Sequence, residues 1–387
     1  MLRKRSVFFV VSLLVLSLMA FGCSNTDQDA KTNEGAEDVI KIGVYEPLTG
    51  DNAAGGQMTY DGMKLANKLY PEILGKKVEL VTVDNKSEQV EAANAVTKLI
   101  DNDKVSVILG SYSSGLAMAG GQVAKEKNVP VIGCSPTNPL VTRDNDYYFR
   151  VCFIDPFQGT VMAKYAFNEL GAKKAAIIRE NGGDYSIGLA KFFKDAFTEL
   201  GGEIVSEIDY QKMDNDFNSQ LTTVNKANPD VIFAPGDFGP SGLLVKQARQ
   251  MDIKTPILGG DTWEAEEFID VAGEAANGIL FSSHFTADAP VTEMTKKFLA
   301  EYEKEYGKKA NAFAALGFDT YIIALHAIEK ANSTDPQAIR DILADVKDFE
   351  GSTGIISLDE NGDALKSAII NQIENGKAVF KSVVEPK

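Results

Sequence analysis

A few polar side chains stand where short apolar runs end, and their types suit a small molecule that carries both a carboxylate and an ammonium group. Ser113 and Ser114 stand where a helix is expected to begin. A hydroxyl and free backbone N–H groups at that place can hold a carboxylate, with help from the helix dipole. Thr137 can add a second hydroxyl, and Asp261 can face an ammonium. The residue types therefore predict binding chemistry.

Aromatic residues follow the same apolar runs and are candidates for the walls of a pocket: Tyr112, Tyr185, Phe238 and Trp263. Pockets for small molecules combine apolar walls with a few convergent polar groups. Each candidate also has a plain structural role open to it. Ser114 is a normal helix cap, Asp261 could cap a helix that starts near Glu264, and Trp263 could belong to the core.

The sequence offers little for catalysis. Its two histidines, His284 and His326, are both expected to be structural, and His326 lies in an apolar helical segment. There is no Gly-x-Ser-x-Gly elbow, no phosphate loop of the Gly-x4-Gly-Lys type and no Cys/His set with metal-ligand spacing. Neighbouring acids such as Asp144 and Asp146 are expected to be solvated rather than a catalytic pair. We expect no enzyme activity, no metal and no cofactor.

The elements that must position these groups alternate along the chain. Strand-like runs at 39–45, 78–84, 105–109 and 130–133 alternate with helical segments at 59–70, 87–100 and 114–127. The pattern restarts with strands at 175–179, 204–210, 231–234 and 256–258 and helices at 188–200, 217–226 and 240–251. Short apolar runs joined by amphipathic helices predict parallel sheets with right-handed crossovers. The expected fold is α/β, with two doubly wound parallel-sheet lobes.

The two halves repeat one unit of strand, polar turn, helix, loop and strand, at 107–133 and again at 231–259. Ligands of open α/β sheets bind beyond the carboxyl ends of the strands. The polar turns there, 111–115 and 134–139 in the first unit and 237–239 and 260–263 in the second, are therefore expected to face one cleft between the lobes. Helices at 291–306, 311–331 and 336–344, then strands at 354–358, 367–372 and 378–383, should add to both lobes.

The start of the chain predicts export. Three basic residues precede an apolar run at 7–20 that is short for a membrane span, which is typical of a secretory signal peptide, here 1–22. The sequence Ala-Phe-Gly-Cys at 20–23 resembles a bacterial lipoprotein cleavage site, so we expect Cys23 to be lipidated; the alternative is an ordinary signal peptide. The polar, acidic composition of segment 23–38 predicts a flexible tether to the membrane. The protein would then lie on the extracellular or periplasmic side of that membrane.

Charge and cysteine content limit the partners. The chain has 39 Lys+Arg and 55 Asp+Glu, for a net charge of −16. Such a surface repels nucleic acid and anionic lipid, so neither is an expected partner. An exported location would permit a disulfide between Cys134 and Cys152, but two buried thiols are the plainer interpretation.

An ordered set of short motifs carries a family resemblance. The motifs are Ile42-Gly43-Val44, Pro47-Leu48-Thr49-Gly50, Gly110 with Ser113-Ser114, Pro130-Val131-Ile132, Thr137-Asn138-Pro139, Lys246-Gln247-Ala248-Arg249, Gly259-Gly260-Asp261 and Gly317-Phe318-Asp319. Each motif is weak, but the set resembles the leucine/isoleucine/valine-type periplasmic binding proteins of ABC transporters, from about Val39 to the end of the chain. The resemblance implies two lobes, 39–154 plus 285–348 and 155–284 plus 349–387, that close on a ligand. It implies three hinge crossings, near 154–155, 283–284 and 349–350.

The resemblance also assigns roles. Ser114 and Thr137 would bind the α-carboxylate of an amino acid, the Ser135 carbonyl and Thr137 would help to hold the α-amino group, and Asp261 would be its counter-charge. Tyr112, Tyr185, Phe238 and Phe313 would line the side-chain pocket. Asp261 stands where many relatives have glutamate, which shortens the reach of the charge. Gly55-Gly56 stands where amino-acid-specific members often have an aromatic residue, which weakens the case for a branched-chain ligand.

The function that the resemblance implies is that of a solute receptor for an ABC uptake transporter, with an amino acid as ligand and permease and ATPase subunits as partners. A monomer is the default expectation. Two alternatives stay open at this point: a sensor that reports its ligand to a membrane signalling receptor, and a receptor for a small amide or carboxylate that is not an amino acid.

Overall fold

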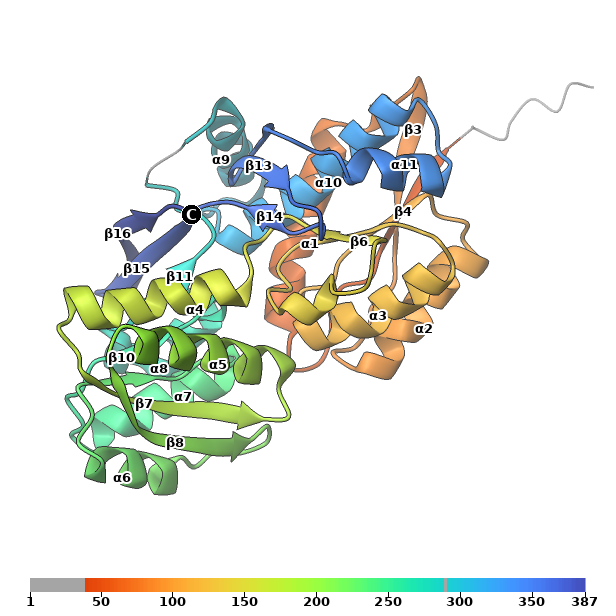
Figure 1. The fold of residues 1–387 in the computed structure, drawn as a ribbon. Coiled ribbons are helices and arrows are strands. Elements are labelled where there is room, and N and C mark those ends of the chain that lie inside the picture. The colour runs from red at the N-terminus through yellow and green to blue at the C-terminus, as the bar shows by residue number, and fades with distance from the viewer. Residues whose placement is uncertain (1–38, 289–290, 387) are drawn as a thin grey trace, which may run out of the picture. The chain divides into compact units, whose positions relative to one another are not determined.

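The structure, a computed structural model, describes residues 39–288 and 291–386 (Figure 1). The signal peptide, Cys23 and the tether expected within residues 1–38 lie outside the described residues.

The first half of the chain builds a six-stranded sheet. Its order is β2-β3-β1-β4-β5-β6, with all neighbours parallel except the short β2 against β3. The strands are β1 (Ile40–Val44), β2 (Glu72–Ile73), β3 (Lys76–Thr82), β4 (Val107–Leu109), β5 (Val131–Gly133) and β6 (Tyr148–Arg150). Strands β4, β5 and β6 are buried along their whole length, as expected for parallel strands with helices on both faces.

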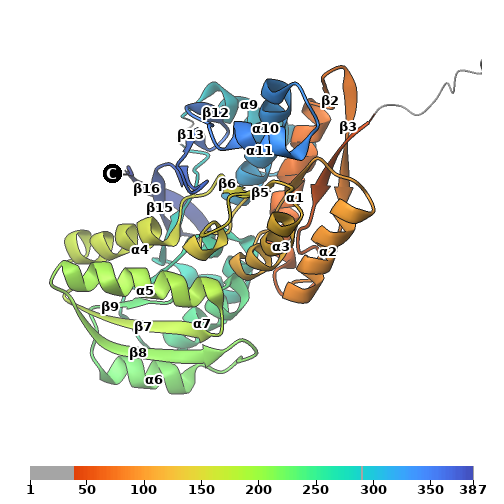
Figure 2. The ribbon, with the colours of Figure 1, turned by 45° about the vertical axis from the view of Figure 1, so that its right-hand side comes forward.

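Helices from both ends of the chain cover this sheet (Figures 1 and 2). They are α1 (Ala53–Leu69), α2 (Gln89–Asp101), α3 (Ser114–Glu126), α9 (Glu293–Tyr306), α10 (Ala312–Ala331) and α11 (Pro336–Leu343). Helices α1 and α10 cross closely because each has a glycine at the contact. A Cβ on Gly62 would lie 1.9 Å from the Ala314 carbonyl oxygen, and one on Gly317 would lie 1.9 Å from that of Thr59. We call this sheet and its helices the first lobe.

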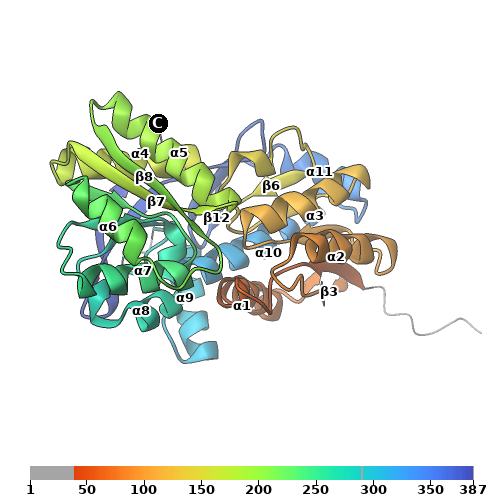
Figure 3. The same ribbon diagram turned by 90° about the horizontal axis from the view of Figure 1, so that it is seen from below.

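The second lobe is a seven-stranded sheet in the order β16-β15-β11-β10-β9-β7-β8. Its parallel strands are β7 (Lys174–Asn181), β8 (Glu203–Gln211), β9 (Val231–Phe233), β10 (Ile257–Gly259) and β11 (Leu280–Ser283), and β15 (Ala368–Glu374) and β16 (Lys377–Val384) add an antiparallel edge. Its helices are α4 (Asp155–Lys164), α5 (Asp184–Glu199), α6 (Asn218–Lys226), α7 (Phe238–Gln250) and α8 (Glu266–Ala272). Figure 3 shows α4 and α5 on one face and α6, α7 and α8 on the other.

Short helical turns complete the elements: η1 (Pro139–Val141), η2 (Tyr165–Glu169), η3 (Asp261–Glu264) and η4 (Gly273–Ala276). A third, three-stranded sheet is formed by β12 (Phe349–Gly351), β13 (Gly354–Leu358) and β14 (Ala364–Leu365). The turn between β12 and β13 is held to α10, because the backbone N–H groups of Ser352 and Thr353 donate to the Asp319 carboxylate at 2.5 and 3.0 Å.

The chain crosses between the lobes three times: between β6 and α4, between β11 and α9, and between β14 and β15. The last crossing lies near Lys366, later than the position near 349–350 that the resemblance implied. The hydrogen bonds to Asp319 are the reason, because they keep residues 349–353 beside a helix of the first lobe.

The doubly wound α/β fold and the internal repeat are confirmed. Strands β4 and β5 pair in parallel around α3, and β9 and β10 do so around α7. Helix α1 begins at Ala53 rather than near Thr59, and β6, β11 and α4 were not foreseen. The helix expected to start near Glu264 is α8, which begins at Glu266. Cys134 and Cys152 are both free and buried. Each thiol donates a hydrogen bond, to Glu46 Oε1 at 3.1 Å and to the Pro136 carbonyl at 3.4 Å, so the disulfide alternative is wrong.

Candidate functional site

The polar turns of the two lobes enclose one small cavity, with a volume of about 10 Å³. It is lined by Tyr112, Ser113, Ser114, Ser135, Tyr185, Asp237, Asp261, Thr262 and Phe313. The first lobe supplies the residues after β4 and β5 and Phe313 of α10, and the second supplies the residues after β9 and β10 and Tyr185 of α5. The carboxyl edges of both sheets therefore meet at one site, as the topology rule predicts.

The N-terminus of α3 forms one side of the cavity. Ser113 is the cap residue, with extended φ and ψ of −94° and 142°, and Ser114 is the first helical residue. The cap residue of α3 is therefore Ser113, and the interpretation of Ser114 as a helix cap is wrong. The Ser114 Oγ accepts a hydrogen bond from the backbone N–H of Asn138 at 3.2 Å, which ties α3 to the turn after β5. The first-turn N–H groups of a helix have no partner within it, so this end of α3 suits an anion.

The turn after β5 brings Ser135 and Thr137 close to Ser114. The Ser135 hydroxyl donates to the Tyr112 carbonyl at 3.1 Å. Thr137 does not line the cavity but is fully buried behind it, and its hydroxyl has no hydrogen-bond partner among the described residues. A buried hydroxyl without a partner costs free energy, so Thr137 is suited to receive a polar group at the site.

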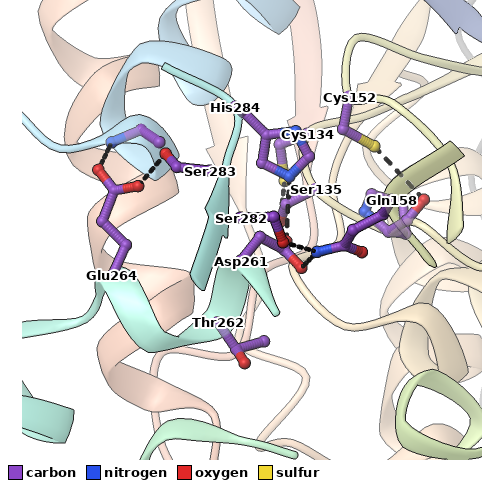
Figure 4. Close-up of polar contacts among 12 residues, drawn as sticks. Cys134, Ser135, Cys152, Gln158, Asp261, Thr262, Glu264, Ser282, Ser283 and His284 are labelled. Atoms are coloured by element: carbon purple, nitrogen blue, oxygen red, sulfur yellow. Dashed lines mark hydrogen bonds and ion pairs between the residues drawn. The ribbon is translucent and has the colours of Figure 1, made fainter. Parts of the chain in front are cut away.

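Asp261 lies on the opposite side, at the start of η3, and is 2% exposed. Its Oδ1 accepts from Gln158 Nε2 at 2.6 Å and from the Tyr185 hydroxyl at 2.8 Å, and its Oδ2 accepts from His284 Nε2 at 3.0 Å. Figure 4 shows the Gln158 and His284 side chains turned toward this carboxylate. An ionised carboxylate has about four acceptor sites, so one remains for a ligand.

The hydrogen bonds keep Asp261 charged. Burial alone would raise its pKa, but the bonds from His284, Gln158 and Tyr185 and the His284 ring outweigh burial and hold the pKa below its usual value. Burial lowers the pKa of His284 itself, despite the opposing effect of Asp261. The site thus presents a fixed negative charge in a buried position.

His284 and Gln158 were missed as site residues. His284 follows β11, a strand that the pattern did not reveal, and Gln158 lies in α4, a helix that was not foreseen. Gln158 also donates to the Ser282 hydroxyl at 2.8 Å, which fixes its amide between β11 and Asp261. The available signal for His284 was the crossing between the lobes that the resemblance implied near 283–284.

Tyr112 and Phe313 form the aromatic wall, with ring centroids 5.0 Å apart in an edge-to-face arrangement. The Tyr112 ring lies against α1 at Gly55, where a Cβ would be 2.3 Å from the ring carbon Cζ. Glycine at this position makes room for the Tyr112 ring. The Tyr112 ring therefore occupies space beside residues 55–56, where the resemblance noted that an aromatic residue is missing.

Phe238 and Trp263 do not line the cavity. Trp263 is fully buried and stacks on Phe268 with ring centroids 4.6 Å apart. Trp263 therefore belongs to the core, which was one of its two interpretations. Phe238, the first residue of α7, is also a core residue at 2% exposure. Its neighbour Asp237 lines the cavity instead and accepts a hydrogen bond from Asn52 Nδ2 at 3.0 Å, across the two lobes.

Further contacts join the lobes at the rim of the site. Lys212 pairs with Asp51 at 3.1 Å. The Asp184 backbone carbonyl accepts from Asn138 Nδ2 at 2.8 Å, and its carboxylate accepts from Gln89 at 3.3 Å. We call these three contacts, with Asn52–Asp237, the rim contacts. They hold the two lobes in a closed arrangement around the cavity.

Residues 39–378 match the family described as periplasmic binding protein. The chain belongs to this family. It is similar to a leucine binding protein, LivK, from Thermotoga maritima, with 41% identity, a TM-score of 0.88 and coverage of 90% of this chain and 99% of that one. It is also similar to a branched-chain amino acid transporter substrate binding protein, LivJ, from Streptococcus pneumoniae in complex with isoleucine, with 36% identity, a TM-score of 0.85 and coverage of 90% and 100%.

A third solved structure that is similar to this chain contains a different ligand. It is a solute binding protein of an ABC transporter from Rhodopseudomonas palustris in complex with 3,4-dihydroxy benzoic acid, with 26% identity, a TM-score of 0.81 and coverage of 90% of this chain and 98% of that one. The fold thus hosts ligands with and without an ammonium group, and the residues of the site must decide between them.

Proposed function

We propose that this periplasmic binding protein is the extracytoplasmic solute receptor of an ABC uptake transporter and that its ligand is an aliphatic amino acid of the branched-chain type. The observation that carries the proposal is the opposition of an anion-binding helix end at Ser114 and a charged carboxylate at Asp261 across one cavity. A group that favours an anion and a group that carries a negative charge therefore face each other, which fits a zwitterion with one carboxylate and one ammonium. The ligands named for the leucine- and isoleucine-binding relatives support the same class.

In this proposal the carboxylate of the amino acid lies at the N-terminus of α3, where it accepts from the Ser114 hydroxyl and first-turn N–H groups. The ammonium lies toward Asp261, with Thr137 and the Ser135 carbonyl as further acceptors. The aliphatic side chain packs on Tyr112 and Phe313. Hydrogen bonds to charged groups are each worth about 1.5–3 kcal/mol, so the two ends of the ligand supply most of the selectivity for amino acids.

Binding requires the lobes to separate and close. A cavity of about 10 Å³ has room for about one water molecule, so an amino acid enters only after the rim contacts open. The first lobe holds Ser114, Ser135 and Thr137, and we propose that it receives the ligand first. The second lobe then adds Asp261 and Tyr185 and shields the ligand from water. Opening and closing rotate about the three crossings between the lobes.

The proposal includes the setting in which the receptor works. The chain is exported, anchored at the outer face of the cell membrane through a lipid on Cys23, and delivers its ligand as a monomer to permease and ATPase subunits. The acidic segment 24–38 would let the receptor reach the permease from its anchor.

A second candidate ligand class is an aromatic carboxylate, as in the relative from Rhodopseudomonas palustris. Asp261 argues against this class here. Its charge is fixed by three hydrogen bonds, and an anion without an ammonium would lie beside a buried negative charge that it cannot neutralise.

A thermal-shift screen of the mature chain tests the proposal, with leucine, isoleucine, valine, polar amino acids and aromatic carboxylates as ligands. A ligand at 100 times its Kd adds about 2.7 kcal/mol of stability, which raises Tm by several degrees. We expect the largest shifts with the branched-chain amino acids. Shifts with aromatic carboxylates alone would contradict the assignment of the ligand, while the fold and the transport role would stand.

A further inference from the structure

A second carboxylate, Asp155, is buried beside the site without a partner. Asp155 is the first residue of α4, directly after the first crossing between the lobes, and its exposure is 0%. Neither Oδ1 nor Oδ2 has a hydrogen-bond partner in the parts of the chain that the structure describes. Buried polar groups are almost always paired, and an unpaired buried carboxylate is costly in its charged form. Asp155 therefore needs a role that the closed protein alone does not supply.

The surroundings of Asp155 place it at the ammonium side of the site. Its backbone N–H donates to the Thr137 carbonyl at 2.8 Å, and the Thr137 hydroxyl lies close enough to lower the Asp155 pKa, although neither side chain meets hydrogen-bond geometry. From α5, a Cβ on Gly188 would lie 3.1 Å from Asp155 Oδ2.

The titratable and charged groups that face Asp155 come from three further elements: Asp261 of η3, Arg150 of β6 and Tyr185 of α5. The Arg150 guanidinium is already used, because it binds Asp363 at 2.6 Å and three oxygens of the segment 136–142. Among the described residues, no cation pairs with Asp155.

The unused hydrogen-bonding atoms near Asp261 are mostly acceptors. Oε1 of Gln158 accepts only, the Asp155 carboxyl accepts only once it is ionised, and the Thr137 hydroxyl can accept as well; all three are buried and have no partner among the described residues. Asp261 itself has one acceptor site to spare. An excess of acceptors beside a fixed negative charge suits a group with three donors and a positive charge. An ammonium is that group.

We propose that Asp155 is a second anionic contact for the ammonium group of the ligand, which it shares with Asp261, and that Asp155 loses a proton when such a ligand binds. The inference rests on the proposed function, because it assumes a ligand with an ammonium group. The step balances simply. The O–H bond of the Asp155 carboxyl breaks, its proton passes to the solvent, and the ligand keeps its three N–H bonds.

The electrostatics support the step. Burial raises the pKa of Asp155 to about 8, against smaller lowering effects of Thr137 and Arg150, and the charge of Asp261 raises it further. Near neutral pH the closed, ligand-free site therefore holds Asp155 protonated. An adjacent ammonium favours the charged form, so the pKa falls when the ligand is bound. Proton release then occurs below about pH 8, and the affinity rises as the pH approaches 8 from below.

The test compares leucine with 4-methylpentanoate, which is leucine without its amino group. Because Asp261 disfavours an anion without an ammonium, 4-methylpentanoate is expected to bind more weakly and is titrated at higher concentration. If it does not bind, the protons that leucine releases from the wild-type chain and from Asp155→Asn are compared instead. Calorimetric titration of the mature wild-type chain, in buffers of different ionisation enthalpy, counts the protons released. The groups that face the carboxylate and the aliphatic chain are the same for both ligands, so the difference isolates the ammonium side. Asp261 contributes nothing to this difference because it is already ionised. We expect leucine to release about one proton more than 4-methylpentanoate at pH 7, from a pKa that falls from about 8; no difference would overturn the proposal.

The variant Asp155→Asn supplies the second arm, with Asp195→Asn as its control. Asp195 lies on α5 with 57% of its side chain exposed, so its variant removes the same charge away from the site. We expect Asp155→Asn to lower the affinity for leucine by about tenfold or more, to leave that for 4-methylpentanoate unchanged, and to remove the extra proton. Equal losses for both ligands, or none, would overturn the proposal. If Asp155→Asn does not fold, the wild-type proton count decides. A wild-type chain that binds no amino acid would instead overturn the proposed function.

Discussion

The replacement Asp261→Asn is the most direct test of the opposed charges at the site. The change keeps the shape of the side chain and removes its charge. It also replaces one acceptor by a donor, in a place where Gln158, Tyr185 and His284 all donate to the carboxylate at 2.6–3.0 Å. One charge-assisted contact to the ligand is lost, at about 1.5–3 kcal/mol. The Kd for leucine should therefore rise by roughly 10- to 150-fold, since 1.4 kcal/mol corresponds to a factor of ten.

Isothermal titration with leucine and 4-methylpentanoate measures this effect, with Tm as the check on folding. The control is Asp270→Asn, which changes an exposed acid on α8. This control has the same net charge as Asp261→Asn. The loss should be confined to leucine, because only leucine brings an ammonium to Asp261. A variant that folds and binds leucine with unchanged affinity would refute the assignment of Asp261 as the counter-charge. An equal loss for both ligands would point to collapse of the site rather than to a lost charge pair.

Three other predictions concern packing, a buried ion pair and pH. Gly55→Ala should lower leucine affinity by about tenfold in titrations, because the new methyl group pushes the Tyr112 ring into the cavity; unchanged affinity would contradict the placement of that ring. Arg150→Met should lower the free energy of unfolding in urea by about 3–5 kcal/mol, because it leaves Asp363 buried without its cation; a loss below 1 kcal/mol would be inconsistent with a buried pair. Burial raises the pKa of Glu46 to about 8, so its stabilising contribution is complete below its unfolded pKa and is lost as pH rises through 8. Urea unfolding from pH 5 to pH 8 should therefore show a decline that is smaller in Glu46→Gln, and equal slopes would count against this.

The parts of the fold that the sequence predicted are those whose local pattern and tertiary role agree. Strands β4, β5, β9 and β10 are apolar runs buried on both faces, and α3 and α7 follow polar turns. The unforeseen strands are different. Strand β6 contains Arg150, whose burial depends on Asp363 more than two hundred residues later, and β11 ends in two serines that read as a loop. Such elements are defined by partners distant in sequence, which periodicity does not register.

The sequence likewise predicted only part of the site. Ser114 and Asp261 could be named because the topology rule gives the edge of the sheet at which ligands bind. The rule does not give the direction of each side chain in a turn. Asp237 and Phe238 are adjacent, yet Asp237 lines the cavity and Phe238 enters the core. His284 and Gln158 were not predicted because β11 and α4, the elements that position them, were not predicted. Asp155 was not predicted because only the packed structure reveals that its carboxylate has no partner among the described residues.

The close crossing of α1 and α10 at Gly62 and Gly317 has a consequence for biosynthesis. The helix that covers the first sheet beside α1 is made only after the whole second sheet's parallel strands have been synthesised. A chain that emerges start-first therefore cannot complete the core of its first lobe until its last quarter arrives, and pairings between segments so far apart form slowly. For an extracytoplasmic protein, this order of assembly delays completion of the first lobe's core until most of the chain has been made.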